Sequence, residues 1–165
     1  MIPDLLDIAS IHAAYADGSL TPVQLFTALL DRIDSCPDKS VFISRFGREE
    51  ILSQAAKLDI SQINTLPLFG IPFAVKDNID VSGIPTTAAC PAFAYTPKAD
   101  AFVVAKLRAA GAIVLGKTNL DQFATGLNGT RSPFGAPRSV FHPDYISGGS
   151  SSGSAVAVGA GLASF

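Results

Sequence analysis

Apolar side chains recur at helical spacing in the first part of the chain, and this periodicity predicts two amphipathic helices. The first runs up to Asp17-Gly18, a pair that is typical of a helix end. The second begins with Thr21 as N-cap and Pro22 at its first helical position, and it ends at Cys36. We expect both helices to cover a core with their apolar faces. These faces consist of Leu5, Ile8, Ala9, Ile11 and Ala13 in the first helix, and of Leu25, Phe26, Leu29, Leu30 and Ile33 in the second.

Further along the chain, the apolar spacing changes to that of strands. Residues 68–78 are apolar on both alternating faces until Lys76, which is typical of a central strand covered on both sides. A helix closed by Gly111 and a second apolar strand follow, and this order predicts a βαβ unit. The other expected elements are a strand at residues 41–46, a helix at 48–58 with Ala55, Ala56 and Leu58 facing inward, the helix at 100–110, the strand at 112–116 and a short helix at 117–125.

The C-terminal part is predicted to consist of a long loop and a glycine-serine turn that opens a helix. Residues 126–146 are dense in Gly, Pro, Asn and Arg with little periodicity, and long loops of this kind often carry function. The sequence GGSSSGS at residues 148–154 runs into the apolar segment 155–165, which indicates a buried helix rather than a flexible linker. We therefore expect the hydroxyls of this turn to take part in a chemical reaction.

The composition indicates a soluble domain with a large buried fraction. The 165 residues are 48% hydrophobic and 16% charged, and the net charge of −2 gives no reason to expect nucleic acid or a membrane as partner. Cys36 and Cys90 have neither metal-binding nor redox spacing, which predicts reduced thiols in a cytoplasmic protein and no metal site. The first residues lack the basic and apolar pattern of an export signal.

Lys76 is the first candidate for chemistry, because it ends a strand that we expect to be buried. Burial disfavours the ammonium ion and lowers the pKa of a lysine from its ordinary value of about 10.4, so such a lysine can act as a base. Alternatively, Lys76 points into solvent or pairs with Asp77 or Asp80. A serine partner would favour the first interpretation, since lysine can activate serine without histidine. His12 and His142 are both expected to be surface or structural residues.

Three blocks resemble, in this order, the amidase signature family: GIPFAVKDN at residues 70–78, GKTNLDQF at 116–123 and GGSSSGSA at 148–155. Within this family, FATGLNGTRSPFGAPR at residues 123–138 resembles allophanate hydrolases, which hydrolyse the product of urea carboxylation. The resemblance implies an α/β fold, an α/β/α sandwich with a mixed central sheet. It also implies hydrolysis of amides through an acyl-enzyme, without a cofactor.

The same resemblance implies roles for individual residues. Lys76 matches the base of a Ser-cisSer-Lys triad, and Ser150 matches the bridging serine, which follows a cis peptide bond and relays a proton. Ser151, Ser152 and Ser154 are then expected to cap the helix or to pack. For a ureide substrate, hydrogen-bond donors would come from the long loop, although its arginine could instead only pin that loop. The expected substrate-binding residues are Gly126, Asn128, Gly129 and Arg131.

The third member of the triad has no match in this chain. In the family the nucleophilic serine follows the bridging serine by roughly two dozen residues, whereas the sequence stops at Phe165. We therefore expect the N-terminal part of a single amidase domain, with a helical cover at residues 1–60 and the start of the signature core at 61–165. Such a chain is expected to be inactive. It would end inside an apolar helix with an exposed sheet edge, so we also expect it to be unstable or to aggregate without a companion chain.

For the full-length protein, the resemblance implies a small-molecule amide or ureide substrate, no nucleic-acid or membrane partner, and a homodimer. Two alternatives stay open. The A subunit of a tRNA-dependent amidotransferase shares the triad but couples glutamine hydrolysis to transamidation. In a module of another class, the glycine-serine turn would bind an anion through backbone N–H groups. The turn lacks the Gly-Lys-Ser/Thr ending of a P-loop, which argues against the anion-binding module.

Overall fold

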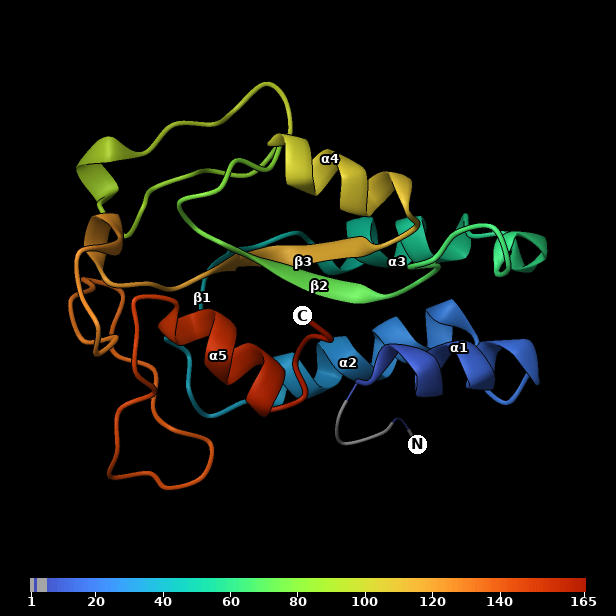
Figure 1. Ribbon diagram of the computed structural model, residues 1–165, viewed down its shortest axis with the longest axis horizontal. Coiled ribbons are helices and arrows are strands. Elements are labelled where there is room, and N and C mark those ends of the chain that lie inside the picture. Colours follow the sequence, from blue (N-terminus) through green and yellow to red (C-terminus); the bar gives the residue numbers. More distant parts are fainter. Residues whose placement is uncertain (1, 3–5) are drawn as a thin grey trace.

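The computed structural model describes residue 2 and residues 6–165, and in this part of the chain five helices surround a three-stranded sheet (Figure 1). The predicted apolar position Leu5 lies outside the described residues. The helices are α1 (Ile8–Ala16), α2 (Pro22–Ser35), α3 (Arg48–Ala56), α4 (Phe102–Ala109) and α5 (Ser152–Gly159). The strands are β1 (Phe42–Arg45), β2 (Pro72–Lys76) and β3 (Ile113–Thr118).

The sheet is mixed, as predicted, with the strand order β1-β3-β2. β1 is antiparallel to β3, whereas β2 is parallel to β3. Along the sequence, α4 connects the parallel strands β2 and β3, which confirms the βαβ unit. The strand ends at Lys76, as predicted. The prediction that it is the central strand is wrong for the described residues, because β3 holds the central place. The other side of β2 meets the last two residues: Ser164 N–H donates to Pro72 O at 2.9 Å, and Ala74 N–H donates to Phe165 O at 3.0 Å.

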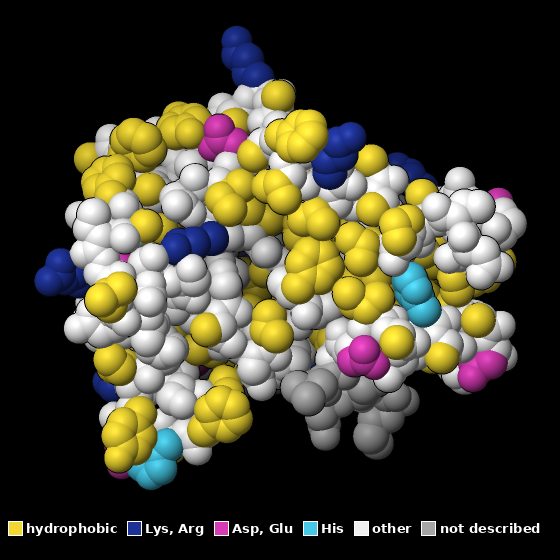
Figure 2. All heavy atoms as spheres, viewed as in Figure 1, with side chains coloured by type: hydrophobic (Ala, Val, Ile, Leu, Met, Phe, Trp, Pro, Cys, Tyr) yellow, Lys and Arg dark blue, Asp and Glu magenta, His cyan; other side chains and the backbone are white. Residues whose placement is uncertain are grey.

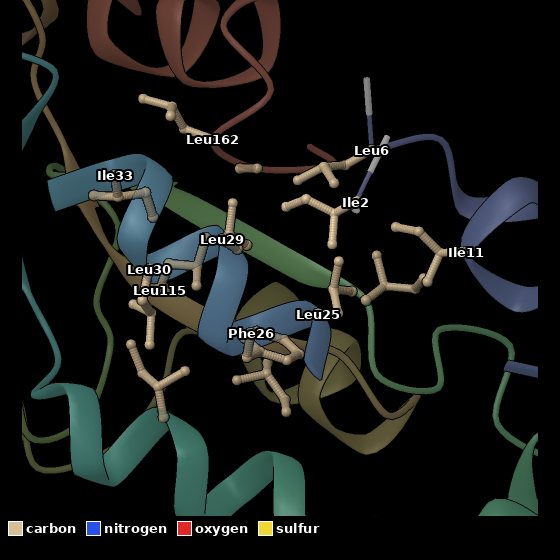
Figure 3. Close-up of a cluster of buried hydrophobic side chains, with 14 of the residues drawn as sticks. Ile2, Leu6, Ile11, Leu25, Phe26, Leu29, Leu30, Ile33, Leu115 and Leu162 are labelled. Carbon is tan, nitrogen blue, oxygen red and sulfur yellow. The ribbon is translucent and has the colours of Figure 1, made fainter. Parts of the chain in front are cut away.

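Helices lie on both faces of the sheet, which gives the expected α/β/α layers (Figure 1). α4 lies above the sheet in this view and buries Val104 against Phe73, Val75 and Val114. α1, α2 and α5 lie below the sheet, and α3 packs against α2 and β3. The larger apolar cluster fills this lower layer, and Figure 3 labels ten of its side chains: Ile2, Leu6, Ile11, Leu25, Phe26, Leu29, Leu30, Ile33, Leu115 and Leu162.

The apolar face predicted for α1 is only partly right, since Ile11 is buried but Ala9 and Ala13 are exposed. The helix α2 follows from local sequence signals. Thr21 caps α2 in a reciprocal box: Gln24 N–H donates to Thr21 Oγ1 at 3.2 Å, and Thr21 N–H donates to Gln24 Oε1 at 2.9 Å. The apolar stripe predicted for α2 is buried throughout. In α3, Ala55 is buried as predicted, but Ala56 is exposed and Ile51 is buried instead. Ile51 and Ala55 are four residues apart and share one face of the helix, whereas Ala56 lies about 100° around it.

The helix predicted at residues 117–125 is wrong, because β3 continues through Thr118 and only a short 3₁₀ turn, Gln122–Ala124, occurs in that range. Lys117 continues the strand since a buried acid compensates its charge. Its Nζ lies 3.0 Å from Asp77 Oδ1, and both side chains are fully buried. The sequence pattern could not show this partner, which lies on a different strand end.

Further polar contacts surround this buried ion pair. Lys117 Nζ donates to Thr86 Oγ1 at 2.9 Å and to Pro85 O at 3.3 Å. Asp77 Oδ2 accepts from the Thr87 amide at 3.0 Å and also from the Thr87 hydroxyl. Burial lowers the pKa of Lys117, and the neighbouring carboxylate of Asp77 opposes that shift. The pair therefore ties the ends of β2 and β3 to the loop at residues 85–87.

The last predicted helix is shorter than expected. α5 ends at Gly159, and Gly161, with a φ of +64°, turns the chain back toward the sheet. The final residues then lie along β2, as the hydrogen bonds of Ser164 and Phe165 show. The expectation that the sequence stops inside an apolar helix is therefore wrong.

Some apolar side chains remain on the surface, as the yellow spheres in Figure 2 show for one face. Among the most exposed are Phe102, Leu127 and Phe141. The first begins α4 and the other two lie in the long loop, so none of them belongs to the sheet. Within the described residues, no helix has both the length and the apolar character needed to cross a bilayer.

Leu29→Ala is expected to lower the free energy of unfolding by about 2–5 kcal/mol, because Leu29 is fully buried in the larger apolar cluster. Val23→Ala, at an exposed position of the same helix, is the matched control, with an expected change of less than about 0.5 kcal/mol. Denaturant unfolding followed by far-ultraviolet circular dichroism measures both. Equal losses in the two variants would contradict the buried face of α2.

Asp77→Ala is expected to destabilise the fold by about 3–5 kcal/mol, since it leaves the ammonium of Lys117 buried without its counter-charge. Adding Lys117→Met should restore most of this loss, because the double variant no longer buries a charge. Asp31→Ala removes an exposed ion pair with Arg48 and serves as control, with an expected cost of about 0–1 kcal/mol. Denaturant unfolding of all three variants is the measurement, and a double variant as unstable as Asp77→Ala would refute the explanation.

Candidate active site

The end of β2 and the beginning of α5 bring one amine and two hydroxyls together. Lys76 Nζ lies 2.7 Å from Ser150 Oγ and 2.8 Å from Ser151 Oγ. The peptide bond between Gly149 and Ser150 is cis. Lys76 and Ser150 are 74 positions apart in the sequence, so tertiary folding creates this contact. The structure therefore joins the two residues that the sequence analysis assigned to a triad.

The pleat of the strands directs Lys76 toward α5. In the parallel pair of β2 and β3, Lys76 is the register partner of Thr118, and the Thr118 hydroxyl lies 2.7 Å from the Ser154 hydroxyl on α5. Val75, the neighbour of Lys76, is paired with Lys117 and faces α4. The amines of Lys76 and Lys117 therefore leave the sheet on opposite faces.

A close approach of α5 to β3 makes this geometry possible. Gly153 N–H donates to Asn119 O at 3.0 Å. A Cβ atom on Gly153 would lie 2.3 Å from Val41 O and 2.4 Å from Asn119 N, so only glycine fits at this position. The first turn of α5 can thus press against the ends of β1 and β3, which carries Ser150 and Ser151 to the lysine.

The electrostatic environment of Lys76 fits that of a lysine that can lose its proton. Partial burial lowers the pKa of Lys76, and the negative charge of Asp121 acts in the opposite direction. Asp121 is fully buried. Its backbone N–H donates to Ser150 O at 3.0 Å, so this acid adjoins the same turn that carries the serine.

The three serines after Ser150 differ in their contacts. Ser151 occupies the N-cap position of α5, but its side chain makes no capping hydrogen bond and reaches Lys76 instead. For Ser151 the expectation of a capping or packing hydroxyl is therefore wrong. Ser152 is buried, and Ser154 packs through its contact with Thr118. The sequence offered no signal that would separate Ser151 from its neighbours, because all of them share the same local motif.

The predicted substrate-binding loop lies beside this turn. Gly149 N–H donates to Leu127 O at 2.9 Å. A surface depression of about 650 Å³ opens at this loop. Arg131 lines it, and one of its guanidinium nitrogens donates to Thr125 O at 2.9 Å. Gly129 is different, since it is buried and its N–H already donates to Asp121 Oδ2 at 3.0 Å. The residues that line the depression are Ala124, Thr125, Gly126, Leu127, Asn128 and Arg131.

The remaining candidates for other chemistry belong to other segments of the chain. His142 is exposed and packs against Tyr145 in the long loop, and His12 belongs to α1. Cys36 and Cys90 are both unpaired thiols. In the part of the chain that the structure describes, no group of three or more His, Cys, Asp or Glu side chains has an arrangement that could hold a metal ion.

Comparison with curated proteins finds similar proteins among urea amidolyases and the A subunits of glutamyl-tRNA(Gln) amidotransferases. Urea amidolyase of Saccharomyces cerevisiae is 51% identical over 148 residues, which cover 89% of this chain and 8% of that protein. The A subunit of the glutamyl-tRNA(Gln) amidotransferase of Lawsonia intracellularis is 44% identical over 158 residues, which cover 94% of this chain and 32% of that protein. The chain thus spans a third or less of these relatives, and urea amidolyase is the better match of the two.

Comparison with solved structures agrees with this result. Allophanate hydrolase of Kluyveromyces lactis superposes with a TM-score of 0.83 at 45% identity, and the match covers 98% of this chain and 27% of that one. The family model described as Amidase matches residues 24–165, which include all three sequence blocks and both Lys76 and Ser150. The chain therefore belongs to the amidase family.

Proposed function

We propose that the protein carrying this chain hydrolyses the C–N bond of a small ureide, allophanate, and releases ammonia. The single observation that carries this proposal is the 2.7 Å contact between Lys76 Nζ and Ser150 Oγ, made by two residues of the family's ordered blocks. The identity to urea amidolyase and the likeness to allophanate hydrolase support the choice of substrate. The chain covers 8% of the first protein and 27% of the second.

In the proposed mechanism, Lys76 acts in its neutral form. Its lone pair accepts the proton of Ser150 Oγ, and Ser150 in turn accepts the proton of the nucleophilic hydroxyl. The nucleophile is the serine that the family resemblance expects roughly two dozen residues after Ser150. Its oxygen attacks the carbonyl carbon, the C–N bond breaks, and the proton returns through Ser150 to the leaving nitrogen. Water then hydrolyses the acyl-enzyme by the same proton path. No step requires a cofactor.

The depression beside the turn is the proposed substrate-binding region. Allophanate carries a carboxylate, and arginine recognises carboxylates through several N–H donors. Arg131 uses one nitrogen for Thr125 O, so it both pins the loop and has further donors for a ligand. Asn128 and Gly126 line the same depression. We do not include the amide of Gly129 among the substrate donors, since Asp121 already accepts its hydrogen bond.

Other expectations from the sequence stay predictions. Glutamine hydrolysis, as in an amidotransferase of the tRNA-dependent kind, is the second candidate function, and the 44% identity to that protein favours it. A homodimer and a cytoplasmic location also belong to the proposal. The unpaired thiols of Cys36 and Cys90 support the cytoplasmic location.

Lys76→Met and Lys76→Arg are expected to reduce the rate of ammonia release from allophanate by about 10²–10⁴-fold. The methionine side chain has no group that can accept the proton, and the guanidinium of arginine stays protonated. Lys106→Met, an exposed lysine on α4, is the control and should keep the wild-type rate. Ammonia release by the purified full-length protein that carries this chain, with glutamine as the competing substrate, is the measurement. A faster reaction with glutamine would favour the amidotransferase alternative, and an active Lys76→Met variant would refute the proposed base.

The pH dependence of the wild-type rate follows from the lowered pKa of Lys76. The rate should rise with pH as the amine loses its proton and level off above the pKa of Lys76. Because burial lowers that pKa, the plateau should be reached below the ordinary lysine value of about 10.4. A rate that falls over the range in which Lys76 deprotonates would contradict a neutral lysine base.

Arg131→Ala is expected to raise KM for allophanate by about tenfold or more, because it removes a charged donor from a carboxylate-binding site. An amide substrate without a carboxylate provides the comparison, and its KM should change much less. Steady-state kinetics on both substrates separate the two roles of the residue. An equal change for both substrates would mean that Arg131 only pins its loop.

A further inference from the structure

Asp121 is a buried acid that the proposed mechanism does not use. It follows β3 and has no exposed surface. Its carboxylate accepts two backbone hydrogen bonds from the long loop: Gly129 N–H donates to Oδ2 at 3.0 Å, and Arg131 N–H donates to Oδ1 at 2.9 Å. A buried charge needs such partners, and amide donors are suitable ones. One carboxylate thus holds both ends of the segment 129–131.

The same acid also adjoins the turn that carries the bridging serine. Asp121 N–H donates to Ser150 O at 3.0 Å. A Cβ on Gly149 would lie 2.5 Å from Asp121 Oδ2, and a Cβ on Gly126 would lie 2.5 Å from Asp121 Cγ. The carboxylate is therefore enclosed by glycine backbone from both segments. A longer side chain at position 121, or any side chain at 149, would not fit without movement.

The charges around Lys76 single out Asp121. From the start of α5, Lys76 meets only the neutral hydroxyls of Ser150 and Ser151. From β3, its register partner is the neutral Thr118. Asp77 and Lys117 lie on the opposite face of the sheet and compensate each other. Asp121 is the acid whose charge acts on the Lys76 ammonium.

We propose that Asp121 is a positioning residue of this site: its buried carboxylate fixes the loop at residues 126–131 against the turn that carries Ser150, the hydrogen-bond partner of Lys76. The inference rests on the proposed function for its purpose, because it presumes that the loop and the turn act on one substrate. Its geometry is independent of activity. The test therefore uses backbone hydrogen exchange and lysine titration by nuclear magnetic resonance, neither of which requires turnover.

The first measurement needs no variant. In the wild-type protein, the amides of Gly129 and Arg131 should be protected from exchange by at least about tenfold relative to Thr130, after correction for intrinsic rates. Thr130 lies between them and is exposed, and no hydrogen bond of its amide occurs among the described residues. Equal exchange at the three amides would overturn the proposal.

Two variants then separate the positioning role from the charge. Asp121→Asn removes the charge and replaces one acceptor by an NH₂ group, so exchange at Gly129 or Arg131 should accelerate by about tenfold. Asp121→Glu keeps the charge but is one methylene too long for the enclosed site, so it should also accelerate exchange. Asp144→Asn, an exposed acid of the long loop, is the matched control and should leave both amides unchanged.

Lysine labelled with ¹³C at Cε reports the titration of Lys76 in the same samples. Since the negative charge of Asp121 raises the pKa of Lys76, Asp121→Asn should lower the Lys76 midpoint. Asp121→Glu and Asp144→Asn should leave it near the wild-type value. An unmoved midpoint in Asp121→Asn, or unchanged exchange at both amides, would overturn the inference. Should Asp121→Asn fail to fold, the exchange pattern of the wild-type protein and the exchange rates of Asp121→Glu test the positioning role.

These outcomes are distinguishable from a failure of the proposed function. A protein that releases no ammonia from allophanate, yet shows the predicted exchange and titration, would retain the positioning role and lose only the substrate. A protein that hydrolyses allophanate without these signatures would keep the function and lose the role of Asp121.

Discussion

The contact between the Lys76 amine and the Ser150 hydroxyl depends on how closely the first turn of α5 approaches the ends of β1 and β3. Gly153 sets this distance, because a side chain there would overlap the backbone of Val41 and Asn119. With α5 packed in this position, the glycine-serine turn that precedes it lies next to the end of β2. Ser150 and Ser151 then lie within hydrogen-bond distance of the lysine. The site is thus a consequence of close backbone packing rather than of flexible side chains.

Two lysines on neighbouring strands, Lys117 and Lys76, differ in their burial and in the charge of their nearest partners. Lys117 is fully enclosed and has a carboxylate at 3.0 Å, so its charge is compensated inside the protein. Lys76 is only partly enclosed and has neutral hydroxyls as its nearest partners. The first arrangement stabilises an ammonium ion, whereas the second favours an amine that can exchange a proton. A bulge in the pairing of β2 and β3 helps to separate the two lysines onto opposite faces.

The long loop is the part of the chain with the least regular structure, yet it is anchored at several points. Asp121 holds the amides of Gly129 and Arg131, and Leu127 accepts a hydrogen bond from Gly149. These anchors connect the depression beside the loop to the serine turn. In the proposed mechanism, this connection holds the substrate next to the proton relay.

Much of the fold and part of the site could be predicted from the sequence, because they depend on local signals. The N-cap of α2 at Thr21, the βαβ order and the strand end at Lys76 follow from periodicity and turn chemistry, and the motif blocks led to Lys76 and Ser150. The central place of β3, the end of α5 at Gly159 and the strand position of Lys117 did not follow. Each depends on a partner distant in the sequence. β3 is central because β1 and β2 pair with its two sides, and the chain leaves α5 to bond to the edge of β2. Lys117 stays in the strand because Asp77 compensates its charge. The sequence by itself therefore determined which residues we propose for the chemistry, whereas only the tertiary structure decided their neighbours, since the environment of a buried charge or hydroxyl depends on what folding brings next to it.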